Sequence, residues 1–208
     1  RALQSADVVV WNARWMWPIA EPPPLTSKPP HQKWVFNFDF EAPQYNGQEI
    51  AAAVTDRLAP GIDWTFTYRA SSDFFKPCFK MLPANSQASM MMRNYSEGKD
   101  QLLMWLVSNC IKTRKKVFES LRSHLPRDRV RTYGRCGQRT PCGDFRREDP
   151  TCLRHLMGRY KFYAAFENSR CEGYISEKIL HAYEHNMVPV VWGGLSRSDY
   201  EEIVPKHS

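Results

Sequence analysis

The 208-residue sequence lacks several features that would identify common classes of protein. Its apolar runs are short, as in Leu102–Val107, whereas a membrane-spanning helix needs about 20 apolar residues. It contains neither G-x-G-x-x-G nor G-x-x-x-x-G-K-[ST], so it supports neither a dinucleotide-binding enzyme nor a P-loop NTPase. No internal repeat is visible. The chain begins with Arg1 and has no signal-peptide hydrophobic region, so we expect it to be a fragment of a longer protein.

The composition is that of a folded domain. Hydrophobic residues make up 42% of the chain and charged residues 25%, which is close to the globular average. This is enough apolar material to bury a core, which excludes disorder as the state of the whole chain. The length allows one large domain or two small ones.

The net charge of +7 is unevenly distributed. The segment Lys112–Lys161 has 15 Lys and Arg residues against five Asp and Glu, a net charge of +10. This basic zone is either a solvated helix face with a basic loop (Arg127–Arg147) or a binding surface for nucleic acid, acidic glycans or a phosphate-bearing ligand. Nucleic acid is the weakest of these, because the sequence has no zinc-finger spacing, RNA-binding aromatic signature or heptad-linked basic region.

The cysteines suggest disulfides formed in an oxidising compartment. A zinc site needs tightly spaced pairs such as C-x2-C, and the closest pair, Cys136 and Cys142, has five residues between its members. The sequon Asn94-Tyr95-Ser96 makes Asn94 a candidate for N-glycosylation, which also suits passage through the secretory pathway. The candidate disulfide cysteines, whose pairing the sequence leaves open, are Cys78, Cys110, Cys136, Cys142, Cys152 and Cys171.

In the first half of the chain, strands are predicted over Asp7–Trp11, Lys33–Phe40 and Ile62–Tyr68, with a proline-rich loop over Glu21–Pro30. The irregular stretch before residue 100 predicts a domain boundary, with domains over 1–100 and 101–208.

From residue 101 onward, apolar strands alternate with helical patterns, which predicts a parallel sheet with helices on both faces. Asp149 and Ser176 are predicted to cap the helices that follow them, and Asn186 to end one. Strands are predicted over Leu102–Val107, Val130–Tyr133, Phe162–Phe166 and Val188–Trp192, and helices over Arg114–His124, Asp149–Gly158, Ser176–Asn186 and Ser196–Ile203.

Ligands of parallel α/β sheets bind outside the carboxyl ends of the strands. Polar residues and glycines follow each predicted strand there, as a nucleotide pocket requires. They are Ser108, Asn109, Gly134, Arg135, Glu167, Asn168, Tyr174, Glu177, Lys178, Gly193 and Gly194.

Arg114 and Lys178 each lie near a predicted helix N-terminus, where a cation is unfavourable by about 0.3 kcal/mol or more. Each alone is most simply an ordinary surface cation, but both at one sheet edge favour a bound anion such as a diphosphate. Glu177 could accept hydrogen bonds from sugar hydroxyls or act as a favourable charge in the first helical turn. Tyr174 could stack on a base or cover the loop.

Several segments resemble the signature of the α1,3-fucosyltransferases, glycosyltransferase family 10. The strongest are F-Y-A-A-F-E-N-S at Phe162–Ser169, Y-I-S-E-K at Tyr174–Lys178 and V-P-V-V-W-G at Val188–Gly193. Further similarity covers Trp34–Phe36 with Glu41-Ala42-Pro43, Asp63–Arg69 with Ser72-Asp73, and Val107–Cys110 with Arg114.

The resemblance implies an α/β fold with two Rossmann-like lobes (GT-B type), an acceptor-side lobe over 1–100 and a GDP-fucose-binding lobe over 101–208. The implied activity is transfer of L-fucose from GDP-fucose to O3 of a GlcNAc, with inversion. The implied partners are GDP-fucose and an N-glycan or glycoprotein acceptor. No nucleic acid, metal or bound cofactor is implied, and stimulation by divalent cations is left open. The parent protein is expected to be a type II Golgi membrane protein whose anchor precedes this chain and whose catalytic domain faces the lumen.

The resemblance also implies roles for individual residues. Glu41 corresponds to the general base, and Arg114 and Lys178 to the cations that hold the pyrophosphate. The residues that correspond to the lining of the donor pocket, or that lie beside it, are Asn109, Tyr133, Asn168, Tyr174 and Glu177.

Two departures from the family pattern are visible. The usual E-S-P turn reads Glu41-Ala42-Pro43, which leaves the acceptor open between core and antennal GlcNAc. The chain ends at Ser208, so we expect the donor lobe to be incomplete. The alternatives are another GT-B transferase with a different nucleotide-sugar and a truncated, inactive glycan-binding homologue.

Overall fold

The structure, a computed structural model, describes residues 3–12, 28–38, 59–80, 94–143 and 149–204. The chain forms two compact units, which are described separately. The first unit comprises residues 1–80, 169–176 and 194–202, and the second comprises residues 81–168, 177–193 and 203–208. The division into domains over 1–100 and 101–208 stays a prediction.

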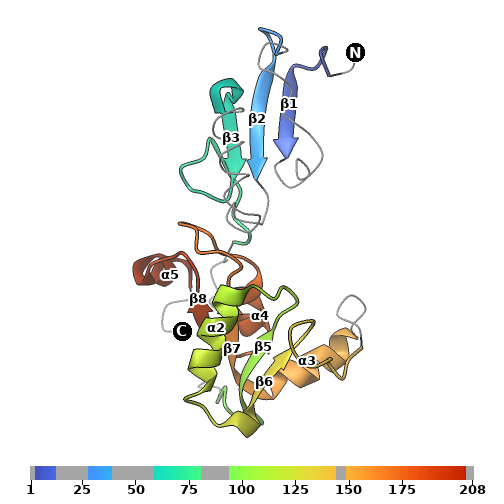
Figure 1. Cartoon of the computed structure of the whole chain (residues 1–208), viewed down its shortest axis with the longest axis vertical. Coiled ribbons are helices and arrows are strands. Elements are labelled where there is room, and N and C mark those ends of the chain that lie inside the picture. The colour runs from blue at the N-terminus through green and yellow to red at the C-terminus, as the bar shows by residue number, and fades with distance from the viewer. Residues whose placement is uncertain (1–2, 13–27, 39–58, 81–93, 144–148, 205–208) are drawn as a thin grey trace, which may run out of the picture. The chain divides into compact units, whose positions relative to one another are not determined.

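The first unit contains a four-stranded, entirely parallel sheet in the order β1-β2-β3-β4 (Figure 1). Three of its strands confirm the predicted ones, although residues 39 and 40 of the second lie outside the described residues. The fourth was not predicted, because two residues are too few to show a strand periodicity. The strands are β1 (Val8–Asn12), β2 (Lys33–Phe38), β3 (Trp64–Thr67) and β4 (Phe74–Phe75), and the short 3-10 helix η4 (Ala59–Gly61) precedes β3.

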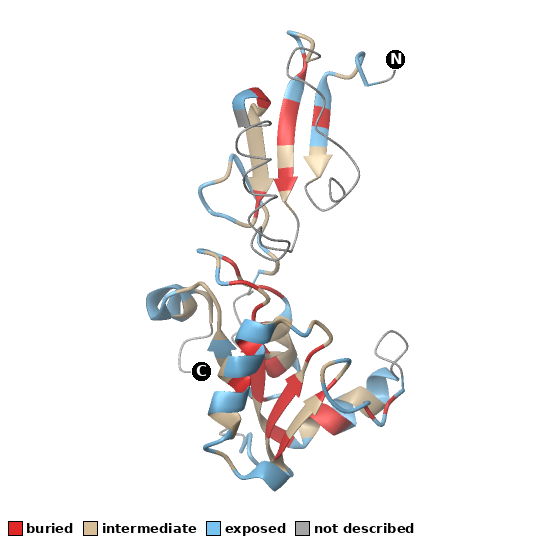
Figure 2. Ribbon diagram, viewed as in Figure 1, coloured by how far each residue is buried: buried red, intermediate tan, exposed pale blue. Residues whose placement is uncertain are grey.

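The core of the first unit is centred on β2. Trp34 is 2% exposed, and its ring meets that of Trp11 on β1 edge to face, with ring centroids 5.1 Å apart. Val9 is buried beside it, and Ile62 packs against the same cluster. Figure 2 shows the buried residues of β2 between its less buried neighbours, as expected for a central strand.

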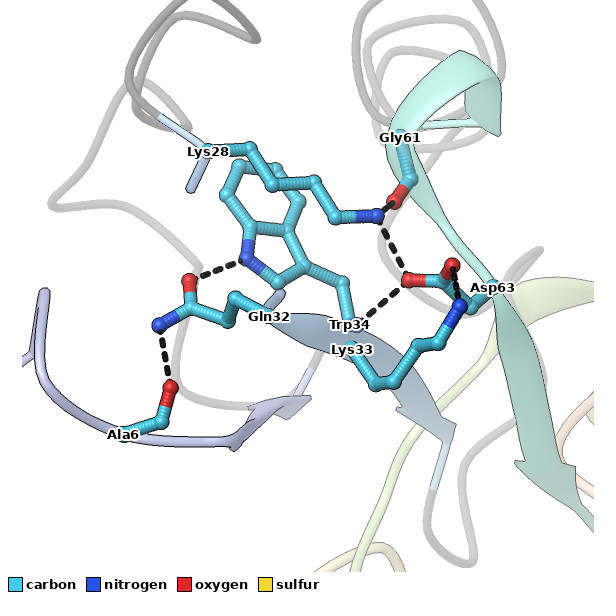
Figure 3. A network of polar contacts seen from close by, with 7 residues as sticks. All are labelled: Ala6, Lys28, Gln32, Lys33, Trp34, Gly61 and Asp63. Carbon is cyan, nitrogen blue, oxygen red and sulfur yellow. Dashed lines mark hydrogen bonds and ion pairs between the residues drawn. The ribbon is translucent and has the colours of Figure 1, made fainter. Parts of the chain in front are cut away.

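The carboxylate of Asp63 joins the start of β2 to the segment before β3 (Figure 3). It accepts hydrogen bonds from Lys28 Nζ at 2.5 Å, Lys33 Nζ at 3.2 Å and the Trp34 backbone N–H at 2.7 Å. Lys28 also donates to the Gly61 carbonyl at 2.7 Å. The hydrogen bond from Lys28 is the largest of the effects that lower the pKa of Asp63 to about 2. This carboxylate is therefore ionised in the folded protein at every pH above about 3.

Gln32 connects the same tryptophan to the residues before β1. Its side-chain oxygen accepts a hydrogen bond from Trp34 Nε1 at 2.6 Å, and its amide nitrogen donates to the carbonyl oxygens of Leu3 and Ala6. Both polar ends of a 3% exposed side chain are thus satisfied.

The second unit contains a parallel sheet in the order β6-β5-β7-β8. All four predicted strands are confirmed, with bounds that agree within two residues. They are β5 (Gln101–Leu106), β6 (Val130–Tyr133), β7 (Tyr160–Phe166) and β8 (Val188–Trp192).

The predicted helices are also confirmed. In the second unit, α3 packs on β7, and α4 packs on β7 and β8; residues 197–202 of the last helix belong to the first unit. The helices are α2 (Lys112–Arg122), α3 (Pro150–Gly158), α4 (Lys178–Glu184) and α5 (Arg197–Ile203), and the 3-10 helix η5 (Arg127–Arg129) precedes β6.

The helix ends agree with the sequence except at α4. Asp149 caps α3 as predicted, accepting a hydrogen bond from the Thr151 N–H at 2.9 Å. The prediction that Ser176 caps α4 is wrong: the N-cap is Glu177, without a side-chain capping bond, and Ser176 is 1% exposed. Asn186 follows the end of α4 with a φ of 54°, the left-handed conformation that ends helices.

Aromatic rings form the core of the second unit. Trp105 on β5 lies 4.4 Å from Phe118 on α2 and 5.9 Å from Phe166 on β7, measured between ring centroids. Figure 2 shows burial concentrated along these strands. No helix in the described part of the chain is both long and apolar enough to cross a membrane.

We expect Asp63→Asn to reduce the free energy of unfolding of the first unit by about 2 kcal/mol, because hydrogen bonds to a charged group contribute about 1.5–3 kcal/mol each. The folded pKa of about 2 lies below the ordinary 3.8, so the contribution is present above about pH 4 and is lost as the pH falls towards 2. Urea unfolding followed by tryptophan fluorescence at pH 7 and pH 2 measures both effects. Asp128→Asn, which removes an exposed carboxylate from η5, is the control. Equal effects of the two variants at pH 7 would contradict the prediction.

Candidate functional site

The candidate site lies in the second unit, at the carboxyl ends of β5 and β7. After β5 the chain forms β6 on one side of that strand, and it later returns to form β7 on the other. The strand order therefore reverses between β5 and β7, and open parallel sheets bind their ligands at such a point. Residues 107–111 follow β5, and Glu167 and Asn168 follow β7. The predicted convergence of these two segments is confirmed.

Arg114 connects the two strand ends. It is the third residue of α2 and only 2% exposed. Its Nη1 donates a hydrogen bond to the Phe166 carbonyl at 3.0 Å, and its Nη2 donates to the Asn109 carbonyl. The guanidinium also lies over the ring of Trp105, 5.6 Å from its centroid. From the sequence, Arg114 was interpreted as either an ordinary surface cation or a cation that binds an anion. In the structure its side chain is buried and donates to backbone carbonyl groups, which need donors.

Lys178 forms an ion pair with a buried carboxylate. Its Nζ lies 3.1 Å from Glu167 Oε2 and 3.5 Å from Glu177 Oε1. Glu167 is 2% exposed, and its backbone N–H donates to the Trp192 carbonyl on β8 at 2.8 Å. Because an unpaired buried carboxylate is strongly unfavourable, Glu167 and Lys178 depend on each other. The lysine is the first residue of α4, close to a helix N-terminus as the sequence predicted, although that helix was expected to begin at Ser176.

Three other predicted residues lie at the same edge. Asn109 is half-buried, and its carbonyl is the acceptor for Arg114. Asn168 is half-buried and directly follows Glu167, whereas the side chain of Glu177 is 56% exposed. The edge therefore combines a buried guanidinium, a partly buried ammonium group and an exposed carboxylate.

Tyr133 is a core residue in the structure. It is 9% exposed at the end of β6, and its hydroxyl shares a 3.1 Å hydrogen bond with that of Tyr160, the first residue of β7. This contact satisfies its polar atom within the core. A role of Tyr133 in donor binding stays a prediction.

Tyr174 belongs to the first unit. It is 2% exposed, and its ring meets that of Tyr68 edge to face at 5.1 Å. Burial is the largest cause that raises the pKa of Tyr68 to about 12, and Cys171 contributes to the shift. The predicted base, Glu41, lies outside the described residues.

Sequence reasoning named Glu167 without assigning it a role, and it did not single out Tyr163. The Tyr163 ring is buried in β7, and burial is the main cause that raises its hydroxyl pKa. The charges of Glu177, Arg114 and Glu167 also influence this pKa, and the hydroxyl stays neutral. A carboxylate directly after a long apolar strand was the available sequence signal for Glu167.

The edge can bind an anion. The first turn of α2 contains no acidic residue, and its N-cap, Ile111, makes no side-chain capping bond. Backbone N–H groups at such a helix start attract negative charge, and Arg114 and Lys178 add full positive charges nearby. Within the described ranges, no group of three or more His, Cys, Asp or Glu side chains could hold a metal ion.

Two disulfides constrain the loops of the second unit. Cys110–Cys136 joins the loop after β5 to the loop after β6, with Cα atoms 5.4 Å apart. Cys142–Cys152 joins the following loop to α3. Cys78 and Cys171 take part in neither bond, so the prediction of disulfides is realised here in four of the six candidate cysteines.

Gly134 allows the loop after β6 to pass close to the end of β5. Its φ is +96°, and a Cβ atom built on it would lie 2.5 Å from the Val107 carbonyl oxygen. The Cys136 N–H donates to the same oxygen at 3.1 Å. Only glycine fits this approach without strain.

Comparison with known proteins identifies two family models in the chain. The model described as "Fucosyltransferase, N-terminal" matches residues 1–78, and "Glycosyltransferase family 10 (fucosyltransferase) C-term" matches residues 96–208. Alpha-(1,3)-fucosyltransferase C of Drosophila melanogaster is 32% identical over 226 residues, covering 100% of this chain and 49% of that protein.

Human relatives have similar identities. The 4-galactosyl-N-acetylglucosaminide 3-alpha-L-fucosyltransferase FUT5 is 35% identical and the 3-galactosyl-N-acetylglucosaminide 4-alpha-L-fucosyltransferase FUT3 is 36% identical, each covering 97% of this chain. The chain spans about half the length of these curated relatives: 50% of FUT5 and 51% of FUT3.

Among solved structures, the crystal structure of an alpha1,3-fucosyltransferase with GDP-fucose matches with a TM-score of 0.51 at 17% identity. The match covers 90% of this chain and 56% of that one. A crystal structure described without a ligand matches with a TM-score of 0.53 at 16% identity. At these identities the likeness concerns the fold, and it supports the α/β architecture with parallel sheets.

We expect Gly134→Ala to destabilise the second unit by about 1–3 kcal/mol more than Gly98→Ala, because the new methyl group would overlap a backbone oxygen. Gly98 is the matched control: its φ of +74° is also positive, but a Cβ there would meet nothing within 4 Å. Thermal unfolding of the two variants measures the difference. Equal losses of stability would mean that the positive φ alone, and not the close approach to Val107, requires glycine at residue 134.

Proposed function

The chain belongs to glycosyltransferase family 10, the fucosyltransferases, and on that premise we propose that the full-length protein transfers L-fucose from GDP-fucose to a glycoprotein glycan. The finer proposal is transfer to O3 of a GlcNAc with inversion at the fucose anomeric carbon. The observation that supports a nucleoside-diphosphate donor is the cationic edge at the β5/β7 switch point, where Arg114 and Lys178 lie in the first turns of α2 and α4, neither of which has a side-chain capping bond. A nucleoside diphosphate is the part of the donor that such an edge suits.

The proposed reaction needs one base and one site for the leaving diphosphate. Glu41, by its correspondence to the family's base, takes the proton from the acceptor hydroxyl as that oxygen attacks the anomeric carbon. The bond from this carbon to the phosphate oxygen breaks, and GDP leaves with the additional negative charge. General-base assistance contributes about 10²–10⁴-fold to such steps.

Lys178 is the residue proposed to contact the diphosphate. Its side chain is 18% exposed, so its ammonium group is held by Glu167 while part of it still meets solvent. A cation that is already held in place before the ligand binds stabilises the charge that develops in the transition state without having to move. Such preorganised charges make the largest electrostatic contribution to catalysis. Asn168 and Glu177, at the same edge, are proposed to bind hydroxyl groups of the donor.

Arg114 acts by positioning in this proposal. Its hydrogen bonds to the Phe166 and Asn109 carbonyls hold the two loops of the edge at a fixed separation. Its charge still adds to the positive potential, because it is screened little inside the protein. Direct contact with the pyrophosphate is therefore not required for its effect.

The linkage and the compartment belong to the finer proposal. Relatives of similar identity are named for 3-linked and for 4-linked transfer, and two of the three described above carry the 3-linkage in their names. The disulfides Cys110–Cys136 and Cys142–Cys152 support an oxidising compartment, in keeping with a Golgi-lumenal catalytic domain.

We expect Glu41→Gln in the full-length protein to reduce fucose transfer by about 10²-fold or more, because the acceptor loses its base. GDP binding, measured by calorimetry, should stay within about twofold, since the carboxylate is proposed to act on the acceptor and not on the nucleotide. Near-normal turnover of Glu41→Gln on a panel of GlcNAc-containing acceptors would reject this base. Glu97→Gln, an exposed carboxylate in the turn before β5, is the control.

We expect Lys178→Met to weaken GDP binding by about 10- to 100-fold, because a charge-assisted hydrogen bond contributes about 1.5–3 kcal/mol. Since that change leaves the Glu167 carboxylate buried and unpaired, the double variant Lys178→Met with Glu167→Gln keeps the test valid if the single variant does not fold. Lys115→Met removes an exposed cation of α2 and is the control. GDP affinity unchanged in a folded double variant would reject Lys178 as the diphosphate ligand.

A further inference from the structure

The second unit has a basic surface at the amino edge of its sheet, opposite the candidate site. Parallel strands begin at a common edge, so the residues directly before β5, β6 and β7 lie on the same side of the unit (Figure 1). They include five cations and two carboxylates, a net charge of +3. This set, called the basic edge below, consists of Lys99 and Asp100 before β5, Arg127–Arg131 over η5 and the start of β6, and Arg159 before β7.

Asp100 lies between two arginines of the basic edge. Its carboxylate accepts hydrogen bonds from Arg159, at 3.0 Å for Nε, and its backbone carbonyl accepts one from Arg129 Nε at 3.2 Å. The hydrogen bond from Arg159 is the largest of the effects that lower the pKa of Asp100 to about 2. Asp100 is therefore ionised and balances the charge of Arg159, whereas the charge of Arg129 stays unbalanced.

Backbone carbonyl groups hold two of the arginines without neutralising them. Arg131 Nη1 donates to the carbonyls of Arg127 and Val130, both at 3.1 Å, and Arg129 donates to the Asp100 carbonyl. A carbonyl group has no net charge, so these hydrogen bonds orient the guanidinium groups and leave their positive charge intact. A guanidinium has five N–H donors. Within the described ranges, Arg129 and Arg131 each use fewer than half of theirs.

Stabilisation of helix ends explains only part of the basic edge. Cations are favourable at the carboxyl ends of helices. Lys99 has that role, because its Nζ donates to the Gly158 carbonyl in the last turn of α3 at 3.1 Å and to the His185 carbonyl after α4 at 3.4 Å. Among the residues that the structure describes, the arginines of 127–131 donate to no carbonyl at the end of an α-helix. Their positive charge therefore needs another explanation.

We propose that the basic edge is a binding surface for an acidic polysaccharide that carries sulfate groups. A planar guanidinium binds two oxygens of one such anion through parallel N–H donors. Arg127 is exposed and Arg129 and Arg131 are half-buried, so successive groups of one extended chain can reach them. Each contact with an exposed cation is weak, and several contacts within one ligand add up.

Two observations favour a polysaccharide over a nucleic acid as this polyanion. Proteins that bind single-stranded nucleic acid stack its bases on aromatic side chains, and the basic edge contains no aromatic residue. The disulfides Cys110–Cys136 and Cys142–Cys152 indicate an oxidising compartment, which suits a secreted polyanion.

The inference goes beyond the proposed transferase activity and does not depend on it. With six residues in β5, the amino and carboxyl edges are about 20 Å apart. A polysaccharide at the basic edge therefore leaves the carboxyl edge free for GDP.

Calorimetric titration with a sulfated octasaccharide prepared from heparin tests the proposal. The double variant Arg127→Gln with Arg131→Gln should weaken binding by about 10-fold, and the dependence of log K on log salt should become shallower by about one to two. The control, Lys112→Gln with Lys116→Gln, removes the same charge from exposed positions of α2 and should change the affinity by less than about twofold. Equal losses in the two double variants would overturn the proposal, since net charge alone would then explain binding.

A second variant and two further ligands keep the test decisive. Arg127→Glu should weaken binding in the same way if the double variant does not fold, because the Arg127 side chain makes no hydrogen bond or ion pair within the described residues. The desulfated octasaccharide should not bind. Equal binding of the desulfated form, or tighter binding of a single-stranded oligonucleotide of the same charge, would reject a sulfated polysaccharide as the ligand. GDP affinity should change by less than about twofold in these variants, so the two proposals can fail separately.

Discussion

The carboxyl edge of the second unit depends on a guanidinium held away from water. Carbonyl groups at and just beyond the ends of parallel strands need donors, and Arg114 supplies them to the Phe166 carbonyl at the end of β7 and the Asn109 carbonyl after β5. The charge is tolerated because these oxygens and the Trp105 ring surround it. The aromatic core around Phe118 holds the helix that carries Arg114. If this contact were removed, the two loops of the candidate site would lose their common anchor.

A second cation completes the edge in a different way. Lys178 is held by the buried Glu167, and the pair is stable only because both partners are present. The arrangement keeps positive charge at a fixed place with part of the ammonium group in solvent, which is what a site for a leaving diphosphate needs. The Cys110–Cys136 disulfide and the close approach at Gly134 restrict the neighbouring loops. The edge proposed to bind the diphosphate is therefore part of a restrained set of loops.

In the first unit, a carboxylate is stabilised by the same principle. There a carboxylate, Asp63, accepts from two lysines and a backbone N–H and so strengthens the link between the start of β2 and the segment that leads into β3. The covering of Trp34 by Lys28 and its bond to Gln32 make this tryptophan the centre of that core. In both units a buried or partly buried charge is matched by several partners, because a single partner would not offset its loss of hydration.

The sequence by itself determined the α/β class, the strand–helix alternation after residue 101 and the family, because periodicity and motif spacing are local properties of the chain. It located Arg114 and Lys178 at helix starts and the polar residues at strand ends. It could not decide that Arg114 is buried on carbonyl oxygens, that Tyr133 bonds to Tyr160, that Glu177 and not Ser176 precedes α4, or which cysteines pair. Those outcomes depend on which side chains meet across strands that are distant in the sequence. Only the folded structure fixes the neighbours that decide between burial and exposure, and therefore between binding a ligand and holding the chain in place.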